Sequence, residues 1–311
     1  MSGPKFTIIV PVYGVEKYML RCADTVLGQT YGNIQFVFVN DGTEDNSMGV
    51  LDELINAKYS HLKGSIHIIN KANEGLPAAR RTGMEYATGD YIMHVDADDW
   101  LETDAVAQIA AKAEETDADI ICFRFYKEEK KRIKNRGDRK YTNAQKDVFL
   151  RDIITHKAYG YVWNKCAKRS LYVENPVTFA KYGMFEDVFL MTQLVYHAST
   201  FAHIDAPLYH YRRTNVQSIS RQKRATKRLY SSMNMLDLYR LYSDHLSESP
   251  LKETAERILY HAAWCSIFYD LKLFDRYPEL SGLIRNIPIG RSNLLPLFQQ
   301  LIVKLYVLSV K

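Results

Sequence analysis

The first hundred residues alternate between short apolar runs and stretches with helical spacing. Four runs have no helical period, as expected of strands buried on both faces of a parallel sheet: residues 6–10, 34–39, 65–69 and 91–95. Helical stretches separate them, near residues 16–29, 45–59 and 76–87. Strand, helix and strand at this spacing predict βαβ units. Gly89 follows the third helical stretch, and we expect it to end that helix as a C′ glycine.

Beyond residue 102 the pattern becomes mixed and then purely helical. Residues 103–116 predict a helix with Thr103 as its N-cap, and residues 118–126 predict a strand. A weaker pattern follows, with helices expected near 142–156 and 186–197 and short strands near 200–204 and 207–212. From residue 221 onward strand signals vanish, and helical spacing dominates over 223–246, 250–274 and 293–310.

These changes of pattern divide the chain into three parts. We expect an α/β fold whose first half, residues 1–105, carries the regular βαβ units. Residues 106–220 form a less regular second half, and residues 221–311 form a C-terminal helical extension. The last helical segment has one apolar face, with Gln299, Gln300 and Lys304 on the other side. Such a face either packs on its own domain or lies in a membrane interface.

Residues 127–140 form a strongly basic segment. They contain eight basic and three acidic residues, a local excess of +5 that equals the net charge of the whole chain. The segment is either a solvated hairpin or loop, or a patch that meets lipid phosphate or an anionic acceptor.

Composition and charge narrow the class of protein. With 311 residues, 36.0 kDa, 47% hydrophobic and 25% charged residues, the chain fits one large α/β domain or two smaller ones. The net charge of +5 and the pI near 8.8 suit partners with phosphates or acidic lipids. The basic runs lack interleaved aromatic residues, which argues against nucleic acid as a partner.

The cysteines and the N-terminal segment favour the cytoplasm. The four cysteines (Cys22, Cys122, Cys166, Cys265) are far apart and have no C-x-x-C spacing, so we expect free thiols in a reducing compartment. The N-terminal segment has neither a basic n-region nor a small-residue cleavage site. No window approaches the ~20 apolar residues that a membrane-spanning helix needs.

The fourth apolar run ends in a cluster of three acids. In "YIMHVDADDWLE" (residues 91–102), Asp96, Asp98 and Asp99 follow a strand that is expected to be buried. Like charges this close raise one another's energy, so we expect a cation beside them. Carboxylates suit Mg²⁺ or Mn²⁺, which bind one or two of them together with substrate phosphates. The alternative is a set of surface acids that cap the following helix.

Other motifs are excluded at this place. An EF-hand loop that begins at Asp96 would need Gly and Glu where Leu101 and Ala107 stand. An aspartyl-phosphate phosphatase motif would need Thr or Val in place of Trp100. The chain also contains neither a P-loop nor a G-x-G-x-x-G sequence, which argues against P-loop and dinucleotide chemistry.

Polar groups follow three of the predicted strands. Residues 11–13 follow the first strand, residues 40–42 follow the second, and the acid cluster follows the fourth. Open parallel sheets bind ligands outside the carboxyl ends of their strands, so we expect these groups to form one site. An exposed Tyr13 can stack on a nucleobase, which is worth ~1–3 kcal/mol. Asp41 can accept a hydrogen bond from a base N–H such as that of uracil.

Two long stretches carry a resemblance to a known family. "TIIVPVYGVEKYMLRCADTVLGQTYGNIQFVFVNDGTEDNS" (7–47) and "NEGLPAARRTGMEYATGDYIMHVDADDW" (73–100) resemble the nucleotide-binding half of family 2 glycosyltransferases. Weaker marks of the bacterial capsule and lipopolysaccharide-type branch are "WNKCAKRSLY" (163–172), "FEDVFL" (185–190) and "YHYRRTNVQSIS" (209–220). The resemblance covers about two-thirds of the chain, and the last ninety residues carry none of it.

This resemblance implies a GT-A fold, in which a Rossmann-like, mostly parallel sheet is flanked by helices. Residues 1–105 would be its nucleotide-sugar-binding half and residues 106–220 its acceptor-binding half. By position, Asp41 would bind the base, Asp96 the ribose or the metal, and Asp98 the metal, a role that Asp99 could share. The donor site would further include Pro11, Tyr13, Arg80, Arg213 and Ser218, the last two at the diphosphate. Of the acid pair in "FEDVFL", Asp187 would be the catalytic base and Glu186 would place the acceptor.

From these features we predict an inverting, metal-dependent glycosyltransferase that uses Mn²⁺ or Mg²⁺. It would move a hexose or N-acetylhexosamine from a UDP-sugar to a glycan or polyprenyl-diphosphate-linked acceptor. The setting would be surface polysaccharide synthesis in the cytoplasm, with peripheral contact at the inner membrane. Two alternatives stay open: a nucleotidyltransferase that makes nucleotide sugars, and a non-catalytic nucleotide-sugar-binding protein. The first is disfavoured because "VPVYGVEKY" contains a single glycine.

Overall fold

The computed structural model describes residues 3–215 and a few residues beyond them. These are residues 230–231, 233–238, 241, 284–285, 300, 303–304 and 307. The helix expected over 250–274 and most of the apolar stripe over 293–310 lie outside the described residues. Gln300, which we expected on the polar side of that stripe, is buried, as are Val303 and Val307.

The first half of the sheet is parallel, as the apolar runs predict. Its strands, in the order β3-β2-β1-β4, are β1 (Phe6–Val12), β2 (Ile34–Asp41), β3 (Ile66–Lys71) and β4 (Tyr91–His94). Phe6 at the start of β1 lies opposite Ile34 of β2 and Tyr91 of β4. Because every pairing among these four strands is parallel, their carboxyl ends meet at one edge of the sheet.

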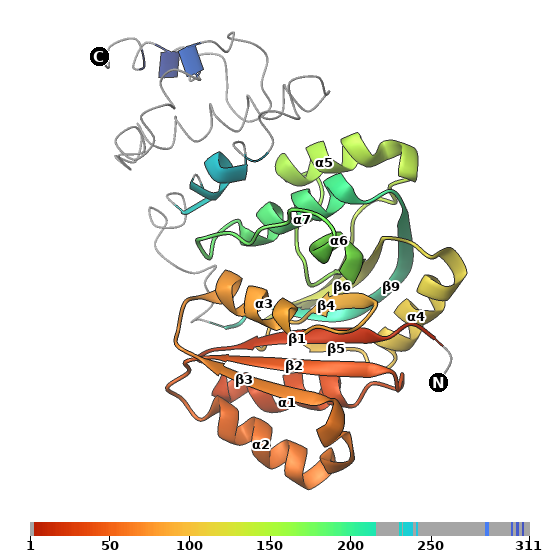
Figure 1. Cartoon of the computed structure of the whole chain (residues 1–311), viewed down its shortest axis with the longest axis vertical. Helices are drawn as coiled ribbons and strands as arrows, with labels where there is room; N and C mark the ends of the chain where they lie inside the picture. Colours follow the sequence, from red (N-terminus) through yellow and green to blue (C-terminus); the bar gives the residue numbers. More distant parts are fainter. Residues whose placement is uncertain are drawn as a thin grey trace.

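Three helices connect these strands and cover both faces of the sheet. α1 (Glu16–Leu27) and α2 (Ser47–Lys58) pack on one face, and α3 (Leu76–Glu85) packs on the other (Figure 1). A short 3₁₀ helix, η1 (Ser60–Ser65), leads from α2 into β3. The predicted βαβ organisation is therefore confirmed.

Alternation along β1 divides the interior into two cores. Ile8 and Val10 belong to the core that contains Met19 of α1, whereas Ile9 belongs to the core that contains Ala79 of α3. Successive side chains of a strand point to opposite faces, so a strand covered on both faces needs apolar residues at every position. This is why the sequence of β1 is an unbroken apolar run.

The second half of the sheet mixes parallel and antiparallel strands. These are β5 (Trp100–Leu101), β6 (Ile120–Glu129), β7 (Arg132–Arg136), β8 (Lys165–Lys168) and β9 (Phe201–Arg212). β8 lies antiparallel between β4 and β6, and β9 runs parallel to β6. β5 pairs with β9 and β7 pairs with β6, both antiparallel. In the part of the chain that the structure describes, all nine strands belong to one sheet.

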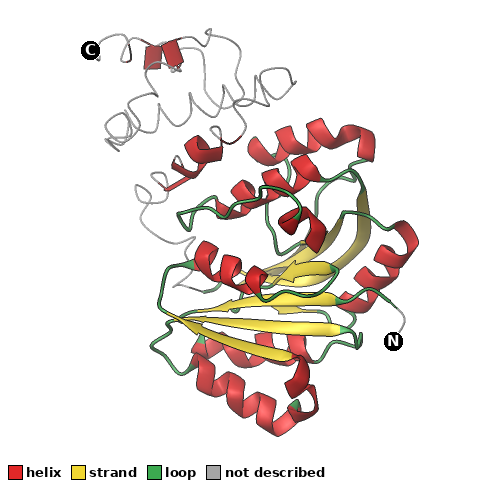
Figure 2. Ribbon diagram, in the orientation of Figure 1, coloured by secondary structure: helices red, strands yellow, loops and turns green. Residues whose placement is uncertain are grey.

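The helices of the second half complete the two outer layers (Figure 2). They are α4 (Ala105–Thr116), η2 (Asn143–Gln145), α5 (Lys146–Ile154), α6 (Arg169–Val173) and α7 (Glu186–His197). α4 packs in the core shared with α1, while α5 and α7 pack in the core shared with α3. The predicted α/β fold, a sheet flanked by helices, is thus confirmed.

Three local predictions are wrong, and the first concerns the start of α4. This helix begins at Ala105 with Asp104 as its N-cap; the Asp104 side chain makes no capping hydrogen bond, and Gln29 Oε1 accepts one from Val106 N at 2.9 Å. Thr103 instead uses its carbonyl to accept a hydrogen bond from Thr30 N at 3.0 Å, which ties the loop to the end of α1. The strands expected at 200–204 and 207–212 are one strand, β9, whose pairing with β6 shifts register around Pro207. Proline has no N–H for a ladder, so the bulge at that position looked like a strand end in the sequence.

The cysteines are unpaired where the structure describes them. Cys22, Cys122 and Cys166 are buried free thiols, as predicted, and Cys265 lies outside the described residues. Among the described helices none is long and apolar enough to cross a membrane.

Gly89 has a packing role instead of the predicted capping role. α3 ends at Glu85 with Tyr86 as its C-cap, and Gly89 does not adopt the left-handed backbone conformation. Its N–H donates to Thr7 Oγ1 at 2.9 Å. A Cβ at this position would lie 2.5 Å from Thr7 N, so only glycine lets the turn before β4 approach the backbone of β1 this closely.

We expect Gly89→Ala to lower the free energy of unfolding by about 1–3 kcal/mol, because the added methyl group forces backbone atoms apart. Urea titration of the purified protein measures this loss. Gly64→Ala is the matched control, since a Cβ at position 64 meets no atom within 4 Å. Equal unfolding midpoints for the two variants would contradict the packing role of Gly89.

Candidate active site

A cavity of about 730 Å³ lies at the carboxyl ends of β1, β2 and β4. Pro11 near the end of β1, Tyr13 after it, Asp41 at the end of β2, and Asp96 and Asp98 after β4 all line it. The Tyr13 side chain is 53% exposed, so its ring is available for stacking. The predicted convergence of these residues at one edge of the sheet is what the structure shows.

Asp41 is held rigidly at the wall of this cavity. Its carboxylate accepts hydrogen bonds from Gly75 N at 2.8 Å and Glu74 N at 3.1 Å, and from Lys71 Nζ at 2.9 Å. Gly75, with φ of 89°, adopts a left-handed backbone conformation that glycine allows at no steric cost. An ionised carboxylate has about four acceptor sites, so it keeps capacity for one more donor, such as a base N–H.

Asp96 and Asp98, the two lining acids that follow β4, have different hydrogen-bond partners. Asp98 Oδ2 accepts a hydrogen bond from Asn215 Nδ2 at 2.7 Å, and Asp96 Oδ1 accepts one from Arg80 Nη2 at 2.8 Å. Burial raises the pKa of Asp98, and the negative charge of Asp96 raises it further. Within the described residues, no three His, Cys, Asp or Glu side chains form a ready-made metal cluster. Asp96 and Asp98 therefore present a pair of carboxylates to the cavity.

Asp99, the third acid of the cluster, lies apart from this pair. Its oxygens accept hydrogen bonds from Tyr209 Oη at 2.8 Å and from Arg212 N at 2.6 Å, both in β9. The side chain is buried, and it does not line the cavity. Burial and the charge of Asp98 raise its pKa well above the ordinary value. Asp99 thus joins the acid segment to β9.

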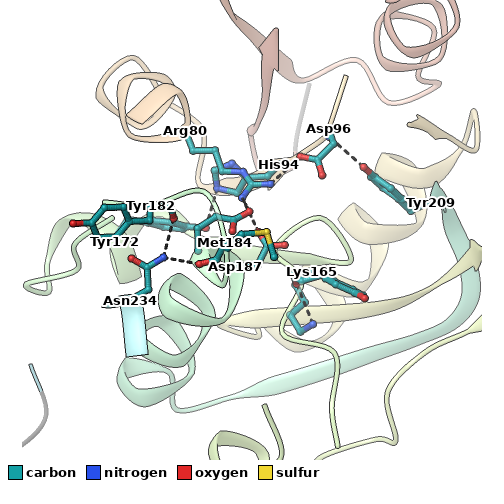
Figure 3. Close-up of polar contacts among 12 residues, drawn as sticks. Arg80, His94, Asp96, Lys165, Tyr172, Tyr182, Met184, Asp187, Tyr209 and Asn234 are labelled. Carbon is teal, nitrogen blue, oxygen red and sulfur yellow. Dashed lines mark hydrogen bonds and ion pairs between the residues drawn. The ribbon is translucent and has the colours of Figure 1, made fainter. Parts of the chain in front are cut away.

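Arg80 of α3 connects the acid segment to the predicted acid pair of α7 (Figure 3). Its Nη2 lies 2.8 Å from Asp96 Oδ1, its Nη1 lies 2.6 Å from Asp187 Oδ1, and Glu186 Oε1 is 3.6 Å away. The side chain is fully buried behind these acids and does not line the cavity. Burial opposes its charge, but Asp187 and Asp96 outweigh burial and raise the pKa of Arg80.

The acid pair lies in the first turn of α7 and lines the same cavity. Glu186 and Asp187 both line it, and they follow Phe185, whose φ of 69° is left-handed. Burial and the charge of Asp187 raise the pKa of Glu186 to about 8, although Arg80 opposes the shift. Burial also raises the pKa of Asp187, which Arg80 counteracts through their direct contact. At neutral pH the arrangement favours a protonated Glu186, whereas the direct contact with Arg80 favours the charged form of Asp187.

The remaining predicted donor residues lie elsewhere. Arg213 follows β9 and donates from Nη1 to Tyr211 Oη at 3.0 Å. It is not among the residues that line the cavity. Ser218 lies outside the described residues.

The sequence analysis missed a row of aromatic side chains on the acid-pair side of the cavity, which we call the aromatic row: Tyr159, Tyr161, Trp163, Tyr209 and Tyr211. Tyr161 and Trp163 stack with ring centroids 4.5 Å apart, and Trp163 stacks on Tyr209 at 4.6 Å. All but Tyr209 line the cavity. The signal was the alternation in "YGYVW" (159–163), which places every second side chain on one face of an extended segment.

Lys165 holds the backbone of the aromatic row in place through hydrogen bonds to its carbonyls. It is buried, and its Nζ donates to Tyr159 O at 2.7 Å and to Tyr161 O at 3.2 Å. Its charge is balanced by Asp138 at 3.5 Å. The "WNK" of the sequence resemblance is therefore a structural unit, in which Trp163 stacks in the row and Lys165 anchors it.

Comparison with known families identifies the family of this chain. The model of "Glycosyl transferase family 2" matches residues 7–175, more than half of the 311 residues. The chain belongs to this family. The match begins in β1 and includes Asp41, Arg80, Asp96 and Asp98, whereas the acid pair of α7 follows its end.

The chain is also similar to individual proteins and solved structures. EpsH of Bacillus subtilis is 29% identical over 278 residues, which cover 86% of this chain and 78% of that protein. TarS (1–349) of S. aureus, crystallised with UDP-GlcNAc, superposes with a TM-score of 0.70 at 16% identity, over 97% of this chain and 89% of that one. PcManGT of Pyrobaculum calidifontis, solved with GDP-Man and Mn²⁺, gives 0.57 at 14% identity, over 100% and 82%. The predicted GT-A fold is confirmed.

The raised pKa of Glu186 predicts a pH-dependent stability. A carboxyl whose pKa is about 8 in the folded protein, against the ordinary 4.5, binds its proton more tightly in the folded state. The resulting contribution to the free energy of unfolding is lost as pH rises from about 5 to about 8. Glu186→Gln removes the ionisable group. The free energy of unfolding of this variant should therefore increase relative to that of the wild type as pH rises from about 5 to about 9. Urea titrations across this range measure the difference, and exposed Glu53→Gln in α2 is the control. A difference that stays constant with pH would refute the burial of an ionisable proton at Glu186.

Proposed function

We propose that this family 2 glycosyltransferase transfers a hexose or N-acetylhexosamine from a UDP-sugar to a glycan or polyprenyl-diphosphate-linked acceptor, with inversion at the anomeric carbon. One observation carries the proposal. Two acid groups, Asp96 with Asp98 and Glu186 with Asp187, line one cavity, and Arg80 lies between Asp96 and Asp187. A transfer by single displacement needs two such groups, because one serves the leaving diphosphate and the other serves the incoming hydroxyl.

The donor end of the cavity suits a nucleotide. Tyr13 offers an exposed ring for stacking, and the rigid carboxylate of Asp41 offers an acceptor for a base N–H. The solved neighbours, TarS with UDP-GlcNAc and PcManGT with GDP-Man, support a nucleotide-sugar donor. Asp41 and the sequence resemblance favour UDP among the nucleotides.

Asp98 and Asp96 fit a divalent metal. Both present hard oxygen ligands to the cavity, and burial, together with the charge of Asp96, raises the pKa of Asp98, a shift that a cation would oppose. Mg²⁺ and Mn²⁺ accept one or two carboxylates and take further ligands from phosphates. When bound there, the ion would neutralise charge on the leaving diphosphate. Asp99 would not take part, because both of its oxygens are used by β9.

The acid pair supplies the proton chemistry. Asp187, kept ionised and oriented by Arg80, would take the proton of the acceptor hydroxyl. The acceptor oxygen then forms a bond to the anomeric carbon as the bond to the diphosphate breaks, and the diphosphate leaves with the electron pair. Glu186, which keeps its proton near neutral pH, would donate a hydrogen bond that places the acceptor. The aromatic row beside the pair would form the acceptor wall.

Surface polysaccharide synthesis with membrane contact is the proposed setting. The motifs of the bacterial polysaccharide branch support it, and so does the β6–β7 hairpin. The hairpin exposes Lys130, Lys131 and Arg132 around its turn, and the Ile133 side chain beside them is 64% exposed. A basic turn with a protruding apolar side chain suits the surface of an anionic bilayer. Basic residues at the edge of a sheet also discourage pairing with a strand of another molecule. The binding test distinguishes this role from membrane contact.

The first test of the proposed function is UDP release from a panel of UDP-sugars with Mn²⁺ or Mg²⁺. We expect one sugar to turn over in the wild type. Asp98→Asn should abolish both turnover and metal dependence, because it removes a charged oxygen ligand. Asp187→Asn should lower kcat by about 10²–10⁴-fold while donor affinity, measured by calorimetry, is retained.

Asp104→Asn is the matched control, since Asp104 is exposed and lies outside the cavity. Pyrophosphate release from a nucleoside triphosphate would favour a nucleotidyltransferase instead. Binding of a UDP-sugar without turnover under any metal would favour a non-catalytic binding protein. Failure of every UDP-sugar to bind would reject the UDP assignment.

The membrane proposal predicts sedimentation with phosphatidylglycerol-containing vesicles at low salt. Each basic residue near an anionic surface is worth about 1 kcal/mol, so changing Lys130, Lys131 and Arg132 to Glu should weaken binding by at least about 100-fold. The matched control changes Lys17, Lys58 and Lys63, three exposed lysines of α1, α2 and η1, to Glu. Equal loss in both triple variants would mean that net charge, and not the hairpin, governs binding.

A further inference from the structure

Asn234, which follows β9 in the sequence, contacts the loop that precedes the acid pair. Asn234 lies in the helical residues 233–238 and is fully buried. Its Nδ2 donates to Tyr182 O at 2.8 Å and to Met184 O at 2.7 Å, so one amide group bridges two carbonyls of the same loop (Figure 3). Neither the family 2 match nor the sequence motifs include this residue.

The bridged loop is part of the active site. Met184 and Phe185 line the cavity directly before Glu186 and Asp187. Phe185 has a φ of 69°, in the left-handed region that non-glycine residues adopt only when their surroundings enforce it. Two hydrogen bonds to the carbonyls immediately before it restrict the path of the loop. The backbone conformation that aims the acid pair into the cavity is therefore supported from outside the loop.

Contacts around Asn234 support the same loop. The ring of Tyr230 stacks on Tyr182 with centroids 5.1 Å apart. Met235 packs with Phe185 and Ile154, and Leu238 packs with Phe189 of α7. The segment thus covers the start of α7 with apolar contacts and adds its two hydrogen bonds at one point.

The amide of Asn234 is used only as a donor. Both of its partners are carbonyl oxygens, so only the NH₂ group can face them. Among the described residues its Oδ1 has no hydrogen-bond partner although it is buried. An unpaired buried acceptor costs about 1–3 kcal/mol, which an apolar residue of similar size would not incur. Packing alone does not explain an asparagine here, whereas a need to hold the two carbonyls does.

We propose that Asn234, in the helical residues 233–238, is a positioning residue for the acid pair of this transferase. The inference rests on the proposed roles of Glu186 and Asp187. Asn234 acts through the loop, and it touches neither donor nor acceptor. Misplacing a catalytic group by about 1 Å can cost 10²-fold in rate, so two hydrogen bonds remote from the chemistry are enough to control turnover.

Asn234→Asp tests this directly, because it keeps the shape of the side chain but replaces both donors with a carboxylate that repels the two carbonyls. We expect kcat for UDP release to fall by about 10–100-fold while donor affinity, measured by calorimetry, stays within about twofold. Donor affinity is spared because Tyr13, Asp41, Asp96 and Asp98 lie at the ends of β1, β2 and β4, and not in the loop that Asn234 bridges. The pH profile of kcat should shift as well, since the environment of Glu186 changes.

Asn234→Leu is the second variant, because it avoids the buried charge and should fold even where Asn234→Asp does not. Leu238→Ala is the control: Leu238 is equally buried in the same helical segment but packs on α7 instead of bridging the loop. We expect it to lower thermal stability while it leaves kcat within about twofold and the pH profile unchanged. A stable Asn234→Leu variant with wild-type kcat and pH profile would overturn the inference.

Hydrogen–deuterium exchange separates failure of this inference from failure of the proposed function. The backbone amides of residues 182–187 should exchange faster in both Asn234 variants than in the wild type and in Leu238→Ala. This readout needs no substrate, so it applies even if no UDP-sugar turns over. Unchanged exchange in this loop would refute the bridge. Faster exchange in the Asn234 variants, combined with a wild type that binds no UDP-sugar, would refute only the donor assignment.

Discussion

A single buried guanidinium organises the active site. Arg80 lies on α3 between Asp96, which follows β4, and Asp187, which opens α7. These carboxylates come from the two halves of the GT-A domain, and without a cation between them they would repel each other. Removing one partner of a buried ion pair typically costs about 3–5 kcal/mol, because the remaining charge has no solvent. His94 beneath Arg80 adapts to the same charge: burial and Arg80 lower its pKa well below the ordinary value, so it stays neutral. The distance between Asp96 and Asp187 is therefore set by the reach of one side chain.

The third acid of the cluster secures the segment that the first two depend on. Asp99 accepts a hydrogen bond from Tyr209 Oη, and the same hydroxyl accepts one from Asp96 N at 3.1 Å. Tyr209 in turn stacks on Trp163 of the aromatic row. The acid segment, β9 and the acceptor wall are thus linked through one phenol. A cluster that looked like a metal site of three aspartates divides into two residues that face the cavity and one that holds the fold together.

The sequence predicted the parts of the molecule that depend on local pattern. Strands such as β1 are unbroken apolar runs because the sheet is covered on both faces, and the acids stand at the strand ends that meet at one edge. The missed features depend on contacts between distant residues. β8 has four residues and gains its pairing from β4 on one side and β6 on the other, so no periodicity announces it. The sequence predicts a helix cap at Gly89, because the sequence alone does not show that a Cβ at this position would lie 2.5 Å from Thr7 N. The burial of Arg80 and the bridge made by Asn234 likewise appear only once α3, α7 and the later segment are packed together.

The charge balance around Arg80 explains why two adjacent acids differ in chemistry. One guanidinium faces three carboxylates, those of Asp96, Asp187 and Glu186, so at least one of them is left without compensation. Asp187 makes the short contact and keeps its charge most easily, whereas Glu186, at 3.6 Å, relieves the excess by holding a proton. Beside Asp96, burial and the charge of Asp96 raise the pKa of Asp98. The proposed divalent cation would compensate the negative charge of these two acids. The same shortage of positive charge thus accounts for a proton at the acceptor wall and for the proposed metal at the donor wall.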